Sequence, residues 1–182
     1  MNWRFKLLYD FTDEQFSNAY NSLSVSKKKH VDKLKKQDDK KRSLAAEILL
    51  KQLLQEEYGI NNPVICHYDN GKPYVECEKI CVSIAHSENM VVCAADFEDI
   101  GIDVEKIRPV NKKLVGRVCQ KEEEKYVLED NDNFLYRFFE VWTAKEAYFK
   151  KLGTGITNLK SVNILSLPRQ IFQINGYLVQ II

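Results

Sequence analysis

The chain has 182 residues, of which 45% are hydrophobic and 29% are charged, with 7 Gly and 4 Pro. This composition is that of an ordinary globular protein and excludes a disordered, collagen-like or low-complexity chain. The 27 Lys and Arg residues nearly balance the 26 Asp and Glu residues, so the net charge of +1 gives no overall reason to expect binding to nucleic acid or to a membrane surface. A function that depends on charge must therefore use a local cluster.

The first third of the chain predicts one strand followed by helices. Residues 3–9 alternate apolar and charged side chains, as in a half-buried strand, and a short helix is expected from Thr12 to about Tyr20. The segment 26–42 is the most basic part of the chain, with nine Lys and Arg against three Asp. Leucines then recur at helical spacing up to Gly59, where the helix is expected to end.

The middle third predicts a series of short strands, and the last third returns to helices. Turn-forming residues separate the expected strands, which lie at 64–68, 74–77, 80–85, 91–97 and 100–105. Helices are expected at about 111–118, 121–129 and 133–152. Strands at 161–165, 171–174 and 177–182 close the chain, and Asn175-Gly176 joins the last two as a hairpin turn. No linker divides the chain, so one compact α+β unit is expected.

Cysteine number and hydropathy indicate the compartment. The five cysteines are odd in number and form no CxxC pair, which favours buried, reduced thiols over disulfides or metal ligands. No apolar run approaches the ~20 residues of a membrane-spanning helix, and the N-terminal residues include no apolar signal segment. We therefore expect a cytoplasmic protein.

Two acidic side chains share one face of the strand expected at 100–105. In Gly101-Ile102-Asp103-Val104-Glu105 the alternation of a strand points both carboxylates the same way, with Cα atoms roughly 7 Å apart. Such carboxylates repel each other unless a cation lies between them, so the pair is a candidate ligand set for Mg²⁺ or Ca²⁺. The alternative is a solvated edge strand with two exposed acids.

Two further segments could carry chemistry. Helical spacing places Trp142, Glu146 and Lys150 on one stripe, although a surface Glu–Lys pair beside a core tryptophan would show the same pattern. In Ser83–Ser87, His86 follows a strand and could hold a phosphate, or it could be a structural histidine. The sequence has no nucleophile elbow, Walker loop, HExxH or GxGxxG motif, which disfavours serine hydrolases, P-loop NTPases, zinc proteases and dinucleotide enzymes.

In this order and spacing, the motifs make the chain resemble the Sfp-type 4′-phosphopantetheinyl transferases. The signature of that family is a G-(I/V)-D-(I/V)-E strand followed roughly forty residues later by W-(S/T)-x-K-E-A-x-x-K, and both motifs are complete here as Gly101–Glu105 and Trp142–Lys150. The Gly71-Lys72-Pro73 turn, the Ser83–Ser87 segment, the Lys-rich first helix and Arg42 also match, so the resemblance runs from about residue 24 to about residue 165.

The sequence departs from the family pattern in two places. Ala85 stands where the family usually has a serine, so a hydroxyl contact to the coenzyme would be absent or would come from Ser83 or Ser87. Family members commonly continue with another strand, whereas this chain stops at Ile182. We therefore expect either a shortened second half or an exposed strand edge that a neighbouring chain covers.

The resemblance implies a fold and an activity. The fold is α+β, with two similar halves at 1–100 and 101–182 related by a pseudo-twofold axis, each a small antiparallel sheet packed with helices. The activity is transfer of the 4′-phosphopantetheine arm of coenzyme A to a serine hydroxyl of an apo acyl, peptidyl or polyketide carrier protein, with release of 3′,5′-ADP. Mg²⁺ is the implied cofactor, and neither nucleic acid nor a membrane is an expected partner.

The resemblance also assigns roles to residues. The implied metal ligands are Asp103, Glu105 and Glu146. The implied coenzyme contacts are Lys27, Arg42, Lys72, Pro73, Ser83, His86, Lys145 and Lys150. Lys150 is expected to meet phosphate oxygens during catalysis, and the general base stays open between Glu146 and Glu123.

Two alternatives use the same residues differently. One is a binding module without catalysis, in which the basic segment 27–42 holds nucleic acid, an acidic protein or coenzyme A. The other is a degenerate transferase that retains coenzyme A without turnover. In the transferase reading, the basic segment 26–42 either docks an acidic carrier protein or is a solvated helix.

Overall fold

The computed structural model describes residues 1–23 and 25–182, with the side chains of residues 10, 25, 26 and 30 outside the description. Part of the basic segment 26–42 therefore lies outside the described side chains. The helices are α1 (Asp13–Asn21), α2 (Val25–Lys33), α3 (Gln37–Tyr58), α4 (Val115–Val118), α5 (Lys121–Leu128) and α6 (Phe134–Leu152). Short 3₁₀ helices are η1 (Leu8–Asp10), η2 (Lys112–Leu114), η3 (Leu159–Ser161) and η4 (Ile164–Ser166).

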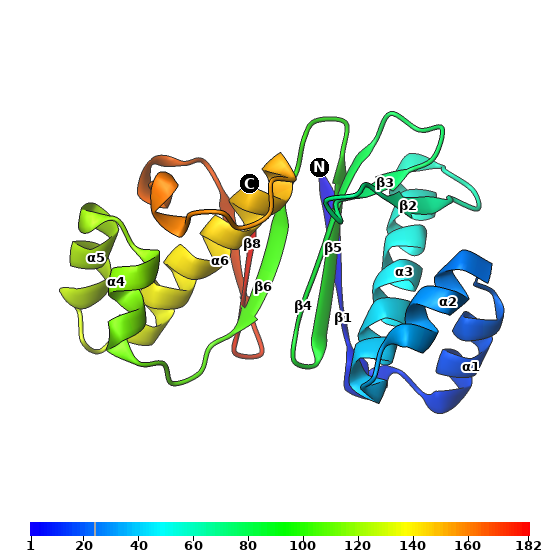
Figure 1. The fold of residues 1–182 in the computed structure, drawn as a ribbon, viewed down its shortest axis with the longest axis horizontal. Helices are drawn as coiled ribbons and strands as arrows, with labels where there is room; N and C mark the ends of the chain where they lie inside the picture. The colour runs from blue at the N-terminus through cyan, green and yellow to red at the C-terminus, as the bar shows by residue number, and fades with distance from the viewer. Residues whose placement is uncertain (24) are drawn as a thin grey trace.

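Two antiparallel sheets stand next to each other in the middle of the molecule, and helices cover the outer side of each (Figure 1). The strands are β1 (Asn2–Leu7), β2 (Ile65–His67), β3 (Pro73–Val75), β4 (Cys81–Ser87), β5 (Met90–Asp96), β6 (Ile102–Lys106), β7 (Gln170–Ile174) and β8 (Tyr177–Ile181). The first sheet has the order β1-β5-β4-β3-β2 and the second β6-β8-β7. The α+β class, with helices packed on each sheet, is therefore confirmed, although the two sheets differ in strand number.

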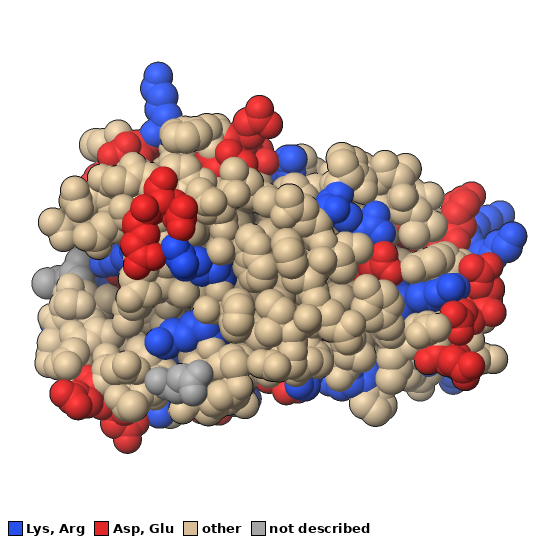
Figure 2. All heavy atoms as spheres, turned by 180° about the vertical axis from the view of Figure 1, so that it is seen from behind, with Lys and Arg blue, Asp and Glu red and all other residues tan. Residues whose placement is uncertain are grey.

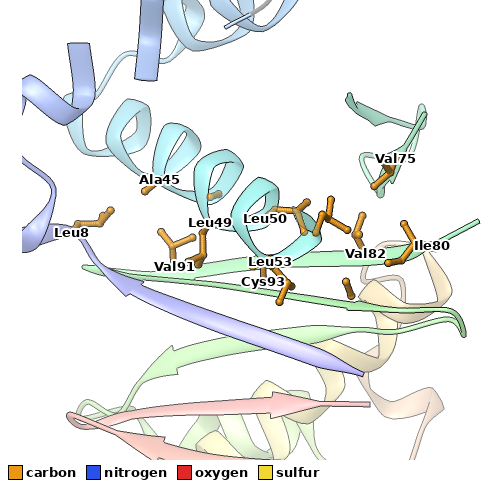
Figure 3. Close-up of a cluster of buried hydrophobic side chains, with 13 residues drawn as sticks. Leu8, Ala45, Leu49, Leu50, Leu53, Val75, Ile80, Val82, Val91 and Cys93 are labelled. Carbon is orange, nitrogen blue, oxygen red and sulfur yellow. The ribbon is translucent and has the colours of Figure 1, made fainter. Parts of the chain in front are cut away.

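The N-terminal half, residues 1–100, is built around α3. Thr12 and Gln15 form a capping box that starts α1, and Gly59 ends α3 in the left-handed conformation at φ 68°. The buried leucines of α3, among them Leu50 and Leu53, pack on the strands of the first sheet (Figure 3). The basic segment 26–42 is divided between α2 and the beginning of α3.

The C-terminal half, residues 101–182, is built around α6, which packs on β6 and β8. Gly101 permits this close approach, because a Cβ atom at that position would lie 1.9 Å from the main-chain oxygen of Ala147. Gly153 ends α6 in the left-handed conformation at φ 68°. Helix and strand are thus close enough for side chains of β6 to meet those of α6.

The two sheets share a buried apolar contact. Side chains of β5, such as Met90 and Val92, belong to the same cluster as Val104 of β6 and Val179 of β8. Strand β4 lies beside β6. The middle of the face seen in Figure 2 carries few charged side chains, whereas charges gather toward both ends of the molecule. The packing between the halves is therefore largely apolar, and the polar site must lie at its border.

One expectation from the sequence is wrong. The segment 161–165 forms no strand, because Asn158 and Asn163 accept hydrogen bonds from the main-chain N–H groups two residues later and start η3 and η4 instead. The strand β8 is the middle strand of its sheet and pairs with both β6 and β7, so β8 itself is not an edge strand. Within the described residues, none of the helices combines the length and the apolar composition that a membrane crossing requires.

Candidate active site

Asp103 is a buried carboxylate that faces α6. Its side chain is 7% exposed, and the Nζ atom of Lys150 lies 2.6 Å from its Oδ1. The other oxygen, Oδ2, is buried and has no hydrogen-bond partner among the described residues. Burial raises the pKa of Asp103 to about 6, against the opposing effect of the Lys150 cation. A buried oxygen without a donor is a candidate ligand for a cation, because burial of an unpaired polar atom is otherwise costly.

Glu146 lies one turn before Lys150 on α6 and faces the same region. Burial is the main reason that its pKa is raised to about 7, and the nearby Asp103 carboxylate adds to the effect. The Lys150 cation acts in the opposite direction, whereas Glu105 raises the pKa further. The structure therefore brings together the three acids that the sequence predicted as one set, close enough to repel each other.

Glu105 differs from the other two acids because both of its oxygens accept hydrogen bonds. The indole Nε1 of Trp142 lies 3.2 Å from Oε1, and the hydroxyl of Ser87 lies 2.8 Å from Oε2. The guanidinium of Arg108 lies 3.5 Å from Oε2. Protein donors thus hold Glu105 in place, while Asp103 keeps an oxygen free.

The three acids fit a divalent cation such as Mg²⁺ by their chemistry. Mg²⁺ binds hard oxygen ligands, commonly one or two carboxylates together with water and substrate phosphates. The unpartnered Oδ2 of Asp103 and the buried Glu146, whose pKa is raised, are oxygen groups whose charge a divalent cation would stabilise. Among the residues that the structure describes, no three His, Cys, Asp or Glu side chains already have the arrangement of a metal site. The ion is therefore part of the proposal below.

A first cavity, of about 340 Å³, opens beside α2 and α3. Lys27, Pro73, Ile84 and His86 are among the residues that line it. Partial burial and the Arg42 cation lower the pKa of His86. The sequence-predicted coenzyme contacts Lys27, Pro73 and His86 therefore meet at one hollow, and Arg42 lies close enough to affect the histidine.

Acidic side chains already pair with Lys27, which lines the first cavity, and with Arg42 close to it. Lys27 lies 3.4 Å from Glu47, and Arg42 forms an ion pair with Asp39. Arg42 also donates a hydrogen bond of 3.0 Å to the main-chain oxygen of Glu88. A bound phosphate would therefore compete with these carboxylates for the two cations.

A second cavity, of about 300 Å³, lies between the first cavity and the three acids. It shares Pro73 and Ile84 with the first cavity, and Glu146 and Lys150 line its other side. The Nζ atom of Lys72 lies 2.9 Å from Asp99 and 2.6 Å from the main-chain oxygen of Lys151. The two cavities are thus neighbours that share the wall formed by Gly71, Pro73 and Ile84.

Ser83 lines the second cavity, but its hydroxyl points to the main chain of β6. Its oxygen accepts a hydrogen bond of 3.0 Å from the main-chain N–H of Ile102, and the residue is 3% exposed. The hydroxyl of Ser87 is similarly engaged with Glu105. Ser87 thus both donates and accepts, whereas Ser83 accepts the N–H of Ile102 and keeps its own hydroxyl proton.

Lys145 and Glu123 form a separate, fully buried ion pair. Their side chains are both 0% exposed, with Nζ and Oε2 2.7 Å apart. Lys145 also donates to the main-chain oxygens of Leu159 and Val162, which leaves it no proton for a phosphate. Glu123 accepts from the main-chain N–H of Ile164. This pair pins the segment after α6 to α5, and its burial argues against both the coenzyme contact predicted for Lys145 and the role of base predicted for Glu123.

Two contacts of Glu105, with Ser87 and with Arg108, were not predicted from the sequence. Ser87 lies on β4 and Glu105 on β6, so only the packing of the two sheets reveals their contact. The four-residue spacing of Trp142, Glu146 and Lys150 predicts that all three face the same way, and this spacing is the feature of the sequence that points to the contact of Trp142 with Glu105.

Comparison with known proteins decides the family. A model of the 4′-phosphopantetheinyl transferase N-terminal domain matches residues 9–98, and one of the 4′-phosphopantetheinyl transferase superfamily matches residues 99–179. The chain belongs to the 4′-phosphopantetheinyl transferase superfamily. The resemblance inferred from Gly101–Glu105 and Trp142–Lys150 is thereby confirmed.

Curated relatives carry the same family name. The 4′-phosphopantetheinyl transferase gsp of Aneurinibacillus migulanus is 35% identical over 121 residues, which are 65% of this chain and 51% of the relative. The transferase Sfp of Bacillus subtilis (strain 168) is 26% identical over 150 residues, 80% of this chain and 67% of the relative. HetI of Nostoc sp. is 27% identical over 178 residues, 92% of this chain and 74% of the relative. The chain thus spans from about half to three quarters of the length of these relatives.

Proposed function

We propose that this chain transfers the 4′-phosphopantetheine arm of coenzyme A to a serine hydroxyl of an apo carrier protein, with release of 3′,5′-ADP. The observation that carries the proposal is the group of Asp103, Glu146 and Lys150, of which Glu146 and Lys150 line the second cavity. Membership of the superfamily supports the same reaction.

The cavities suit the anionic end of the coenzyme. In the proposal, Lys27, Arg42 and His86 bind the 3′-phosphate at the first cavity, in competition with Asp39 and Glu47. Lys72 and Pro73 border the adenosine next to it. The diphosphate then lies toward Glu146 and Lys150, where negative charge must be neutralised.

Asp103, Glu105 and Glu146 would hold Mg²⁺ beside the diphosphate. When bound, the ion would neutralise the diphosphate and the charge that develops on the leaving phosphate. Lys150 donates to a phosphate oxygen in the transition state, and its present contact with Asp103 keeps it at the site before the coenzyme arrives.

Glu146 is the proposed acceptor of the serine proton. The serine oxygen forms a bond to the phosphorus of the pantetheine arm, the bond from that phosphorus to the bridging oxygen breaks, and the bridging oxygen leaves with 3′,5′-ADP. The hydroxyl proton passes to Glu146, which lines the second cavity and can accept it directly or through a water molecule. Glu123 is left out of this step because it is fully buried and paired with Lys145.

The binding-module alternative gains no specific support. Lys41 pairs with Asp13, and Arg42 pairs with Asp39, so acids of the same half compensate part of the basic segment. Acidic and basic side chains alternate over the N-terminal half in Figure 2 and form no continuous basic face in that view. Nucleic-acid binding relies on a clustered basic surface.

The proposal is tested by incubating the protein with coenzyme A, Mg²⁺ and an apo carrier protein of the fatty-acid or the peptide and polyketide type, and weighing the carrier. We expect a mass increase of one phosphopantetheine, its loss in Asp103→Ala, and no increase in the presence of a chelator. Glu98→Gln, which changes an exposed acid just before β6, is the matched control and should keep full activity. No mass increase with any carrier would contradict the proposed reaction, and full activity of Asp103→Ala would contradict the role of Asp103.

A further inference from the structure

Glu105 is held far more firmly than the other two acids of the site. Its Oε1 accepts from Trp142 and its Oε2 from Ser87, whereas Oδ2 of Asp103 has no donor among the described residues. A carboxylate offers about four acceptor positions on its two oxygens. Glu105 can therefore keep both hydrogen bonds and still offer a lone pair to a cation.

Ser87 reaches Glu105 from the opposite half of the molecule. It lies at the end of β4, is 8% exposed, and its oxygen accepts a hydrogen bond of 3.2 Å from the main-chain N–H of Lys106. A hydroxyl has a single proton. Because the oxygen already receives the N–H of Lys106, the proton is directed to Oε2 of Glu105 at 2.8 Å. This contact joins the first sheet to the acidic strand of the second.

Trp142 holds the other oxygen from α6. Trp142 lies one turn before Glu146. Its indole N–H can only donate, so Trp142 is the donor and Glu105 the acceptor of this hydrogen bond. The ring stacks on Phe138 with centroids 6.4 Å apart, which restricts its rotation. The Nε1 atom lies 3.2 Å from Oε1 of Glu105.

We propose that Ser87 and Trp142 are positioning residues that hold one oxygen each of Glu105 and so orient this carboxylate toward the ion shared with Asp103 and Glu146. The inference rests on the proposed function for the ion. Partners that orient a metal ligand commonly change metal affinity or activity by about 10–100-fold when they are removed. Through Ser87, the geometry of the ion site also depends on how the two sheets pack.

The test measures the binding of Mn²⁺ in the presence of coenzyme A and without carrier protein, from the loss of the electron paramagnetic resonance signal of the free ion. We expect Ser87→Ala to weaken Mn²⁺ binding about tenfold and Trp142→Phe to weaken it several-fold. Ser87→Thr, which keeps a hydroxyl, should restore most of the affinity. Ser22→Ala is the control, because the hydroxyl of Ser22 donates to the main-chain oxygen of Ala19 at the end of α1, away from both cavities and the three acids.

A double-mutant cycle separates orientation of Glu105 from a general loss of structure. In the Glu105→Gln background, Ser87→Ala should change the Mn²⁺ affinity little, because the group that Ser87 orients has already been altered. Circular dichroism and thermal unfolding should show that Ser87→Ala is fully folded at the temperature of the Mn²⁺ measurement.

The outcomes distinguish the inference from the proposed function. Wild-type affinity in both Ser87→Ala and Trp142→Phe, or an equal loss in Ser22→Ala, would overturn the positioning roles and leave the proposed function standing. An undiminished effect of Ser87→Ala in the Glu105→Gln background would also overturn them. Failure of the wild-type protein to bind Mn²⁺ with coenzyme A would instead contradict the ion site on which the proposed function depends.

Discussion

Replacing Glu146 with Gln should make the ion-free protein more stable at alkaline pH while abolishing transfer. The pKa of Glu146 is raised from its ordinary value of 4.5 to about 7, chiefly by burial. A carboxyl whose pKa is raised on folding provides stability below its unfolded pKa and loses it as the pH rises through the folded value. The amide of Gln has a similar shape and no charge, so the variant escapes this loss.

The size of the effect follows from the same pKa. A difference of one in pKa corresponds to about 1.4 kcal/mol, so ionised Glu146 costs the folded protein up to about 3 kcal/mol above pH 8. Some relaxation around the new side chain reduces the gain, and we expect about 1–3 kcal/mol. For a protein of this size, 1 kcal/mol shifts the melting temperature by about 2–4 °C.

The assay is thermal or urea unfolding of wild type and Glu146→Gln between pH 4 and pH 9 in the presence of a chelator. The two stability curves should separate from about pH 4.5 to pH 7 and stay a constant distance apart above pH 8. Mg²⁺ added at pH 8 should stabilise the wild type more than the variant. Curves that run parallel over this range, or a variant less stable at pH 8, would refute the reasoning.

Three further substitutions test the packing around the site. Lys145→Met should lower the free energy of unfolding in urea by about 3–5 kcal/mol, because it leaves Glu123 buried without its partner. The double variant Lys145→Met with Glu123→Leu should recover much of this loss. Equal instability of the single and double variants would contradict the argument. Gly101→Ala should lower stability by at least about 2 kcal/mol, because its Cβ would overlap α6, and an unchanged melting temperature would disprove that overlap. Lys150→Met should raise the pKa of Asp103 further, as followed by NMR, and weaken coenzyme A binding about tenfold in calorimetry; an unchanged pKa would exclude the ion pair.

Local sequence signals were enough to predict most of the helices and strands, whereas the division into two halves came from the family resemblance. Gly59 and Gly153, both at φ 68°, end the two long helices where the periodicity of apolar residues stops. The failure at 161–165 has a local cause as well, because its apolar spacing suits a strand while Asn158 and Asn163 offer the main chain competing hydrogen bonds. The position of β8 between β6 and β7 depends on tertiary packing, for which the alternation within one strand holds no information.

The part of the site that lies on one face of α6 could be predicted from the sequence. Glu146 and Lys150 are four residues apart, so they face the same strand and meet Asp103. Lys145 directly precedes Glu146, and one residue turns a helix by about 100°, so its side chain points toward Glu123 instead. Helical geometry alone therefore separates Lys145 from the site, but it does not reveal the buried partner that replaces the coenzyme.

The site lies at the border of the two halves, and each half contributes its own ion pair to it. Asp103 lies on the second sheet and keeps Lys150 of its own half, while Arg42 of the N-terminal half keeps Asp39. Apolar packing between the sheets holds the halves together beneath the cavities. Beside the second cavity, Asn70 donates a hydrogen bond of 2.7 Å to the main-chain oxygen of Gly153. The packing thus sets the distance between the Lys150–Asp103 pair and the Arg42–Asp39 pair before binding. A ligand that contacts both pairs therefore loses little free energy in ordering the protein.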